Sequence, residues 1–233
     1  GWLVHGVGRQ AESRWLVPVT GYIYHNVDLS DADAVWSILE TIRPDSIFHL
    51  AAVHGSSGFS YEEHWREVHA VNVVAVHAVL EYQRLLAPWA RLVYASSSKV
   101  FGEELPDIVS EESPRNSSCI YTTTKNAATD LITYYRKRHG SKSSVIWTFN
   151  HESPRRGPSY FLPKVVNALA DALLCRSRLT EVASLAFWGD WGDANEYMHI
   201  AATLPDQVIG SDMIFATGKT VWAADFVDVL FSK

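Results

Sequence analysis

The sequence predicts an α/β fold, in which a doubly wound parallel sheet carries helices on both faces and is joined to a small C-terminal lobe. Short β-rich apolar runs alternate with segments of helical period, and the joins between them are short. Polar residues collect directly after the predicted strands, which is where ligands of such folds lie. With 233 residues and 47% hydrophobic composition, the chain can form a substantial core.

The N-terminal elements follow from periodicity and punctuation. We expect strands at 2–7, 46–52, 91–95 and 144–149, with a polar loop after the first of them. A helix capped by Ser30, with Asp33 three residues later, should end at Pro44. Two longer helices are predicted at 62–84 and 117–139, and Gly140 closes the second of them.

The elements after residue 150 are shorter and less regular. Helices are predicted at 162–174, 193–204 and 221–231, and strands at 184–187 and 212–216. We therefore divide the chain into a Rossmann-like domain, 1–149, and a substrate-binding lobe, 150–233, that is interleaved with the sheet.

Composition argues against several classes of protein. A net charge of −6 and a pI near 5.9 disfavour nucleic acid as a partner. No apolar run approaches the length of a membrane span and no signal peptide is visible, so we expect a cytoplasmic protein with no membrane partner. Two cysteines are too few for a disulfide framework, and no Cys/His cluster has zinc spacing, so no metal is expected.

Tyr121 and Lys125 carry the clearest chemistry. Four residues apart on a helix, they share one face, and an ammonium near a phenol lowers the phenol's pKa and makes it a usable acid/base. The same spacing also occurs in ordinary surface pairs. The serines Ser96, Ser97 and Ser98 follow the strand 91–95, and they can donate to a substrate oxygen or simply form a turn.

Strand-end serines followed by a Tyr/Lys helix resemble the extended short-chain dehydrogenase/reductases. The run Asn150-His151-Glu152-Ser153-Pro154-Arg155-Arg156-Gly157 is more specific and resembles the GDP-mannose 4,6-dehydratase family. The runs 4–7, 190–192 and 216–218 agree with that family as well, so the resemblance covers nearly the whole chain.

The resemblance implies a role for each matching residue. Tyr121 is the acid/base, Lys125 tunes its pKa and binds a ribose, and Ser97 occupies the place of a catalytic Thr. The implied contacts to the cofactor, NADP or NAD, are made by Arg9, Asp28, Leu29, Leu50, Ala51, Ala52, Lys125, His151 and Arg156. Those to the substrate are made by Ser98, Asn150, Glu152 and Arg155. Arg9 suits a 2′-phosphate, although an ordinary exposed loop arginine is an equal alternative.

Family membership also implies a reaction and an assembly. The substrate is a nucleotide sugar, most simply a GDP-linked one, which is oxidised transiently at C4, loses water across C5–C6 and is reduced at C6. Homodimers or homotetramers would form through the helices 62–84 and 117–139.

The chain departs from the family at three places. Lys99 replaces the catalytic Glu that removes the proton beside the 4-keto group, and a lysine serves as a base only when its pKa is depressed. Otherwise Lys99 is an ammonium that cannot accept the proton, and dehydration loses its general base. The alternative is that Lys99 points to solvent and a strand-end serine or water serves instead. The first strand and its glycine-rich turn are absent, which truncation explains better than loss. Gly189 replaces an Arg that holds the nucleotide sugar, and Ser159 replaces an Asn.

Three hypotheses follow. The first is an NADP-dependent nucleotide-sugar 4,6-dehydratase. The second is a nucleotide-sugar 4-epimerase or 4-keto reductase, which needs Tyr121, Lys125 and Ser97 but no Glu at position 99. The third is a non-catalytic relative, which the retained Tyr121/Lys125 pair disfavours.

Overall fold

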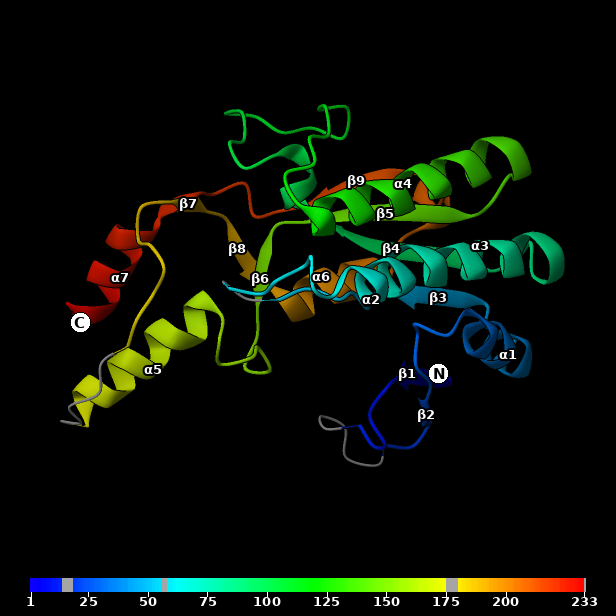
Figure 1. The fold of residues 1–233 in the computed structure, drawn as a ribbon, viewed down its shortest axis with the longest axis horizontal. Helices are drawn as coiled ribbons and strands as arrows, with labels where there is room; N and C mark the ends of the chain where they lie inside the picture. Colours follow the sequence, from blue (N-terminus) through cyan, green and yellow to red (C-terminus); the bar gives the residue numbers. More distant parts are fainter. Residues whose placement is uncertain (14–18, 56–57, 175–179, 233) are drawn as a thin grey trace. The chain divides into compact units, whose positions relative to one another are not determined.

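A computed structural model describes residues 1–13, 19–55, 58–174 and 180–232 (Figure 1). The chain divides into two compact units. The first comprises Gly1–His54, Ser60–Trp147 and Pro205–Met213, and the second comprises Gly55–Phe59, Thr148–Leu204 and Ile214–Lys233. None of the described helices combines the length and apolar character needed to cross a membrane.

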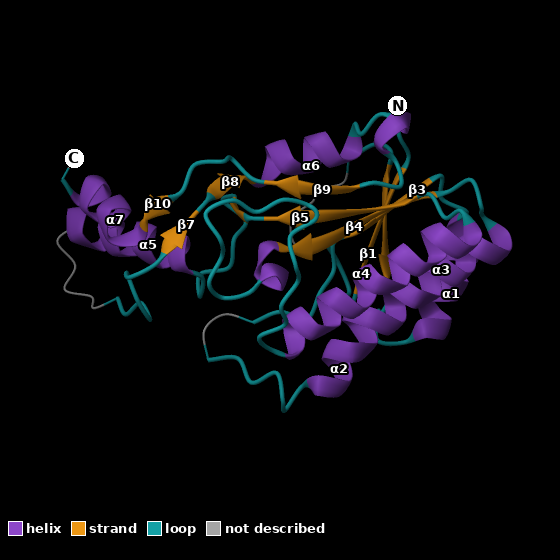
Figure 2. Cartoon of the chain, turned by 90° about the horizontal axis from the view of Figure 1, so that it is seen from above, coloured by secondary structure: helices purple, strands orange, loops and turns teal. Residues whose placement is uncertain are grey.

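The main sheet has the strand order β3 (Ser46–His49), β4 (Arg91–Ser97), β5 (Ser143–Thr148) and β9 (Asp212–Phe215). β3 and β4 run parallel, and all of β5 is buried. The helices α1 (Ala32–Ile42), α3 (Ala75–Leu86) and α4 (Ile120–His139) lie along one side of this sheet (Figure 2). The predicted α/β class with parallel pairing is therefore confirmed, and the predicted strands in this sheet are correct within a few residues.

β1 (Val4–Gly8) and β2 (Tyr22–Asn26) form a separate parallel pair. Between this pair and β3 the described residues make no strand pairing, although the Trp2 and Phe48 rings lie 6.4 Å apart. The sequence predicts that β1 corresponds to the second strand of a doubly wound sheet. In that fold the first strand lies between the second strand and the strand that corresponds to β3. This is the place where strand pairing is interrupted here. The polar loop predicted after β1 contains a strand, β2, whose aromatic and β-branched residues signal it.

The predicted helix 62–84 is interrupted. Its residues form α2 (Trp65–His69), a π-helical turn (Ala70–Val74) and then α3, so the helix begins three residues later than expected. π-Helical turns inside helices frequently mark functional sites. This one carries the fully buried Asn72.

Two helix starts were predicted too early. Asp31, and not Ser30, caps α1, because its side chain accepts hydrogen bonds from the backbone of Asp33 and Ala34. α4 begins at Ile120. Both predicted ends are confirmed: α1 stops at Ile42, before Pro44, and Gly140 closes α4 with a φ of 65°.

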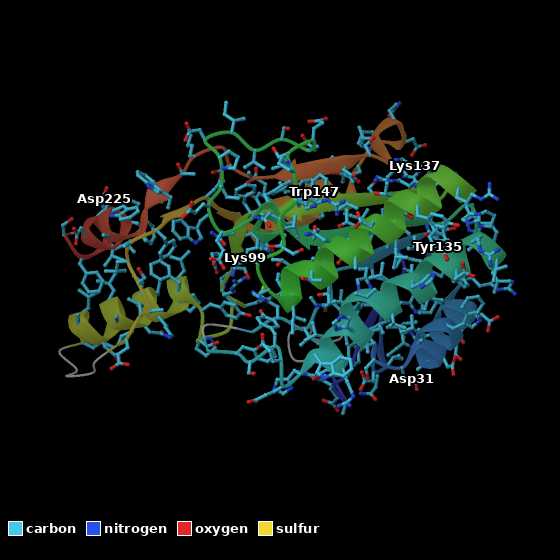
Figure 3. The ribbon with its side chains drawn as sticks, turned by 45° about the horizontal axis from the view of Figure 1, so that its top comes forward. Asp31, Lys99, Tyr135, Lys137, Trp147 and Asp225 are labelled. Carbon is cyan, nitrogen blue, oxygen red and sulfur yellow. The ribbon has the colours of Figure 1, made fainter. Side chains whose placement is uncertain are left out.

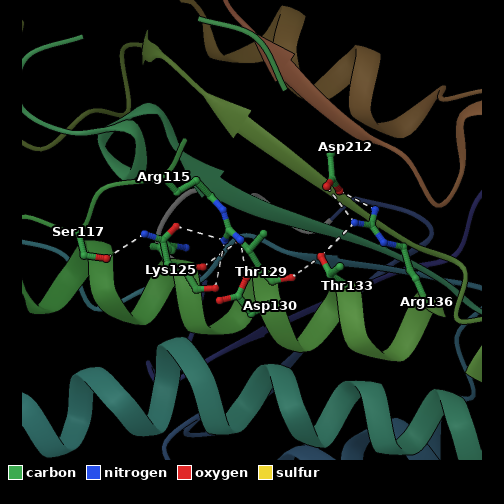
Figure 4. A network of polar contacts seen from close by, with 9 residues as sticks. Arg115, Ser117, Lys125, Thr129, Asp130, Thr133, Arg136 and Asp212 are labelled. Carbon is green, nitrogen blue, oxygen red and sulfur yellow. Dashed lines mark hydrogen bonds and ion pairs between the residues drawn. The ribbon is translucent and has the colours of Figure 1, made fainter. Parts of the chain in front are cut away.

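α4 is fixed to the edge of the sheet by a charged contact. The Arg136 guanidinium donates to both carboxylate oxygens of Asp212, at 2.5 and 2.8 Å, and both side chains are largely buried (Figure 4). Nearer the start of α4, Asp130 pairs with Arg115, which precedes the helix in the chain. The bidentate Arg136–Asp212 pair is costly to break by removing one partner. It therefore orients the helix that carries Tyr121.

The described residues of the second unit form two small strand pairs and three helices. β6 (Asn150–Glu152) pairs with β8 (Trp191–Asp193), and β7 (Trp188–Gly189) pairs with β10 (Val221–Trp222). The helices are α5 (Phe161–Leu173), α6 (Ala194–Ala202) and α7 (Ala223–Phe231). The strand predicted at 184–187 is wrong, because the Ser184 hydroxyl accepts the Ala186 N–H in a local turn and pairing starts at Trp188.

Candidate functional site

Tyr121 and Lys125 lie in the first turns of α4, and both are buried. The Lys125 Nζ atom is 5.8 Å from the centroid of the Tyr121 ring, so the helix brings the predicted pair together. A buried ammonium this near a phenol is the arrangement that can favour the phenolate.

The surroundings of Lys125 determine its charge. Its Nζ donates to the Ala95 carbonyl at 2.7 Å and lies 4.7 Å from the centroid of the Tyr94 ring. Burial lowers the pKa of Lys125 to about 7. The neighbouring His49 ring stacks on Tyr94, and burial, together with the nearby Lys125, lowers the pKa of His49 to about 3. Near neutral pH, therefore, Lys125 can gain or lose a proton while His49 stays neutral.

The structure shows the turn-forming role of the strand-end serines, and donation to a substrate oxygen stays a prediction. The Ser97 Oγ atom accepts the Lys99 N–H at 3.3 Å and so caps the 3₁₀ turn Ser98–Phe101. Its hydroxyl proton is still available for donation to a ligand. Ser98 is half-buried, whereas Lys99 is exposed (Figure 3). The structure thus places Lys99 at the surface.

Two residues that the sequence did not single out contact Tyr121. The His54 and Tyr121 ring centroids are 4.3 Å apart, and the His54 Nδ1 atom makes a 2.6 Å hydrogen bond with the Tyr61 hydroxyl. Tyr61 and Tyr121 are themselves 6.1 Å apart. The one available signal was that His54 closely follows the predicted strand 46–52.

Asn72 links the loop after β3 to α4. Its Oδ1 accepts the Val53 N–H at 2.8 Å, and its Nδ2 donates to the Val53 carbonyl and to the Thr124 hydroxyl. Thr124 directly precedes Lys125. Asn72 therefore fixes the backbone beside His54 relative to the helix that carries Tyr121 and Lys125.

The predicted cofactor contacts of the first unit lie mostly at its surface. Arg9 is 70% exposed and pairs with Glu67 at 2.6 Å. The backbone N–H and the hydroxyl of Ser30 lower the pKa of Asp28, with a smaller contribution from Arg9. Leu50 is exposed, and Leu29, Ala51 and Ala52 are half-buried. The predicted contacts of these residues with a cofactor stay predictions. To bind a phosphate, the Arg9 guanidinium would have to break its ion pair with Glu67.

The Asn150–Gly157 run lies in the second unit, where its side chains interact with one another. Glu152 and Arg156 are 3.7 Å apart, and burial raises the pKa of Glu152. The Arg156 guanidinium lies 4.0 Å from the Tyr160 ring centroid. The His151 Nδ1 atom bonds to the Phe149 carbonyl at 2.8 Å. Asn150 and Arg155 are exposed and available to a ligand.

Gly189, the position of the family's Arg, is buried under an indole ring. A Cβ atom there would come within 2.3 Å of Trp191. Trp191 in turn stacks between Phe161 and Phe226, with centroids 6.0 and 5.8 Å away. The Trp191 ring thus fills the space that a side chain at position 189 would occupy.

The donor set around Lys125 suits the ribose of a nicotinamide dinucleotide. Lys125 has three N–H donors, of which Ala95 accepts one. The buried His49 Nε2 and Tyr94 hydroxyl have no hydrogen-bond partner in the part of the chain that the structure describes. Both of these atoms are closed to solvent, so among these groups it is Lys125 that offers donors to a ribose. Within the same described residues, no three His, Cys, Asp or Glu side chains gather as a metal site would require.

Comparison with known proteins supplies the context for this geometry. The sequence profile of the family described as GDP-mannose 4,6 dehydratase matches residues 11–233. A GDP-mannose 4,6-dehydratase of Sordaria araneosa is 30% identical over an alignment of 238 positions that covers 99% of this chain and 43% of that protein. GDP-mannose 4,6 dehydratase 2 of Caenorhabditis elegans is 28% identical over an alignment of 249 positions that covers 100% of this chain and 64% of the relative. The chain thus spans less than two thirds of either relative.

Solved structures agree on the fold. The UDP-glucose 4-epimerase of Thermotoga maritima, crystallised with UDP-glucose, superposes with a TM-score of 0.83 at 16% identity, covering 100% of this chain and 74% of the other. A dTDP-glucose 4,6-dehydratase of Streptomyces venezuelae, crystallised with NAD, superposes with a TM-score of 0.75 at 18% identity, covering 91% and 64%. At these identities the likeness confirms the Rossmann-type fold.

Proposed function

From the premise that the chain belongs to the GDP-mannose 4,6-dehydratase family, we propose that it is an NADP-dependent nucleotide-sugar 4,6-dehydratase. Its substrate is a GDP-linked hexose. One observation carries the proposal: Tyr121 and Lys125 are buried together, with the pKa of Lys125 lowered to about 7. A packing role alone would not require an ionisable pair in that position.

The residues have separate roles in this proposal. Tyr121 accepts the proton of the sugar O4 hydroxyl, and the Lys125 ammonium stabilises the phenolate that accepts it. Ser97 donates its hydroxyl proton to the same sugar oxygen while its Oγ caps the following turn. NADP, when bound, supplies the hydride acceptor, and Arg9, Asp28 and Lys125 of the first unit would hold it.

A second candidate is a nucleotide-sugar 4-epimerase or 4-keto reductase. The exposed Lys99 favours it, because this side chain replaces the family's catalytic Glu and faces solvent. Epimerisation and keto reduction use Tyr121, Lys125 and Ser97 without a base at position 99. The same acid/base pair therefore serves either reaction.

Product mass separates the two candidates. The protein is incubated with NADP and GDP-mannose, and the nucleotide sugar is analysed by mass spectrometry. Loss of one water supports the dehydratase, whereas an altered sugar of unchanged mass supports the epimerase. Calorimetry with NADP and with NAD is the accompanying measurement, and binding of neither would overturn both candidates.

The proposal includes the assembly and location expected from the sequence. We place a homodimer contact on α3 and α4, where Leu85, Leu86 and Tyr134 are exposed, with a homotetramer as the larger alternative. Association of two such helix pairs would bury these apolar side chains. A cytoplasmic location completes the proposal, and sedimentation of the purified protein tests the oligomeric state.

A further inference from the structure

Tyr94 holds an unusual position beneath Lys125. Its side chain is fully buried on β4, and its ring centroid is 4.7 Å from the Lys125 Nζ atom. His49, its register neighbour on β3, stacks on the same ring at 5.8 Å. The Lys125 ammonium is thus held between the Tyr94 ring and the Ala95 carbonyl.

This contact matters because burial works against the charge of Lys125. Desolvation disfavours an ammonium, and an aromatic face partly replaces the lost hydration through its quadrupole. The ionisable side chains facing Lys125 are His49 from β3, Tyr94 from β4 and Tyr121 from α4; His54 and Tyr61 contact Tyr121 in turn. None of these five is a carboxylate. The Tyr94 ring is therefore well placed to decide how much of Lys125 stays charged.

We propose that Tyr94 is a positioning residue: its ring face holds the Lys125 ammonium against Tyr121 and keeps it charged. The link to catalysis rests on the proposed function, because it is Tyr121 that would use the charge. The contact between Tyr94 and Lys125 can be tested without any turnover.

The competing explanation is that Tyr94 is only a core aromatic. The two explanations predict opposite changes in the pKa of Lys125 when Tyr94 is replaced. If the ring stabilises the ammonium, replacing it by an aliphatic side chain should lower the pKa of Lys125 further. If the ring only fills space, the cavity left by a smaller side chain would admit water and raise that pKa toward its ordinary value of 10.5.

The test measures the pKa of Lys125 by NMR of protein that contains ¹³C-labelled lysine. The Lys125 signal is identified by its absence from the Lys125→Met variant. Tyr94→Leu should lower it by about 0.5 to 1, from the usual strength of such contacts. Tyr94→Phe keeps the ring face and should leave it unchanged. The control Tyr82→Leu removes another fully buried tyrosine, one that packs on Trp36, and should also leave it unchanged.

An unchanged or raised pKa of Lys125 in a folded Tyr94→Leu protein would overturn the proposal. Should Tyr94→Leu fail to fold, Tyr94→Met is measured by the same criterion. With GDP-mannose and NADP, the pH profile of kcat should shift in Tyr94→Leu and not in Tyr94→Phe. If the wild-type protein shows no turnover while the pKa of Lys125 responds to Tyr94→Leu as expected, the result contradicts the proposed function. The contact between Tyr94 and Lys125 is then still supported.

Discussion

The indole of Trp191 lies over the backbone of Gly189, so that a Cβ atom at position 189 would come within 2.3 Å of the ring. An Arg side chain, which the resemblance to the family predicts at this position, would meet the same ring. Because Trp191 is also stacked between Phe161 and Phe226, it cannot turn aside without disturbing the second unit.

Gly189→Ala should destabilise the fold by about 1 to 3 kcal/mol, the usual cost of overpacking. The matched control is Gly157→Ala, whose Cβ would lie 3.6 Å from Tyr160, an ordinary contact distance, and which should change stability by less than about 0.5 kcal/mol. Urea unfolding of both variants measures the difference. Equal stability would show that Trp191 yields easily.

Lys99→Glu should create or raise dehydratase activity if the lost carboxylate is what limits water elimination. The exposed position should tolerate the change, with an effect on stability within about 0.5 kcal/mol. Product mass is the measurement. Lys99→Gln removes the positive charge without adding a base, so a gain in both variants, or in neither, would count against the role assigned to position 99.

Tyr121→Phe should lower turnover by about 10²- to 10⁴-fold, because the variant lacks only the proton-accepting oxygen. NADP binding, measured by calorimetry, should be nearly unchanged. Tyr134→Phe alters an exposed tyrosine of the same helix and should leave both quantities as they are. Retained turnover in Tyr121→Phe would remove this residue from the mechanism.

Local signals made part of this structure predictable. Helical spacing placed Tyr121 and Lys125 on one face, and Gly140 marked the end of their helix, because both features depend on neighbours within a few residues. The cap of α1 was misplaced by one residue, since Ser30 and Asp31 are both good caps and the backbone selects between them.

Contacts between distant residues could not be predicted in this way. His54 and Tyr121 lie on different elements, and Asn72 reaches Val53 and Thr124 only because a π-helical turn directs it inward. The lowered pKa of Lys125 likewise depends on burial by β3 and β4. Such properties arise from tertiary packing, which a single sequence does not specify.

The buried His49 should make the protein sensitive to acid. Its pKa is about 3 in the folded chain against 6.5 ordinarily, so between these values the unfolded chain binds the extra proton. The contribution of His49 to stability is therefore complete above pH 6.5 and is lost as the pH falls toward 3. Glu81, with a pKa lowered to about 2 by its bonds to Arg84 and Tyr135, adds a similar loss only below pH 4.5.

In the interval from pH 6.5 to 4.5 the raised pKa of Glu152 acts in the opposite direction, so the effect of His49 is obtained as the difference between wild type and a His49 variant. Over this interval, the free energy of unfolding should fall by about 2 to 3 kcal/mol through His49 alone, at 1.36 kcal/mol per pH unit. His49→Phe removes the titrating ring and should flatten that slope, while His199→Phe, an exposed histidine of α6, should preserve it. Urea unfolding at several pH values gives the slopes. An equal slope in wild type and His49→Phe would mean that His49 takes up its proton without leaving the core, and that the space beside Lys125 admits water.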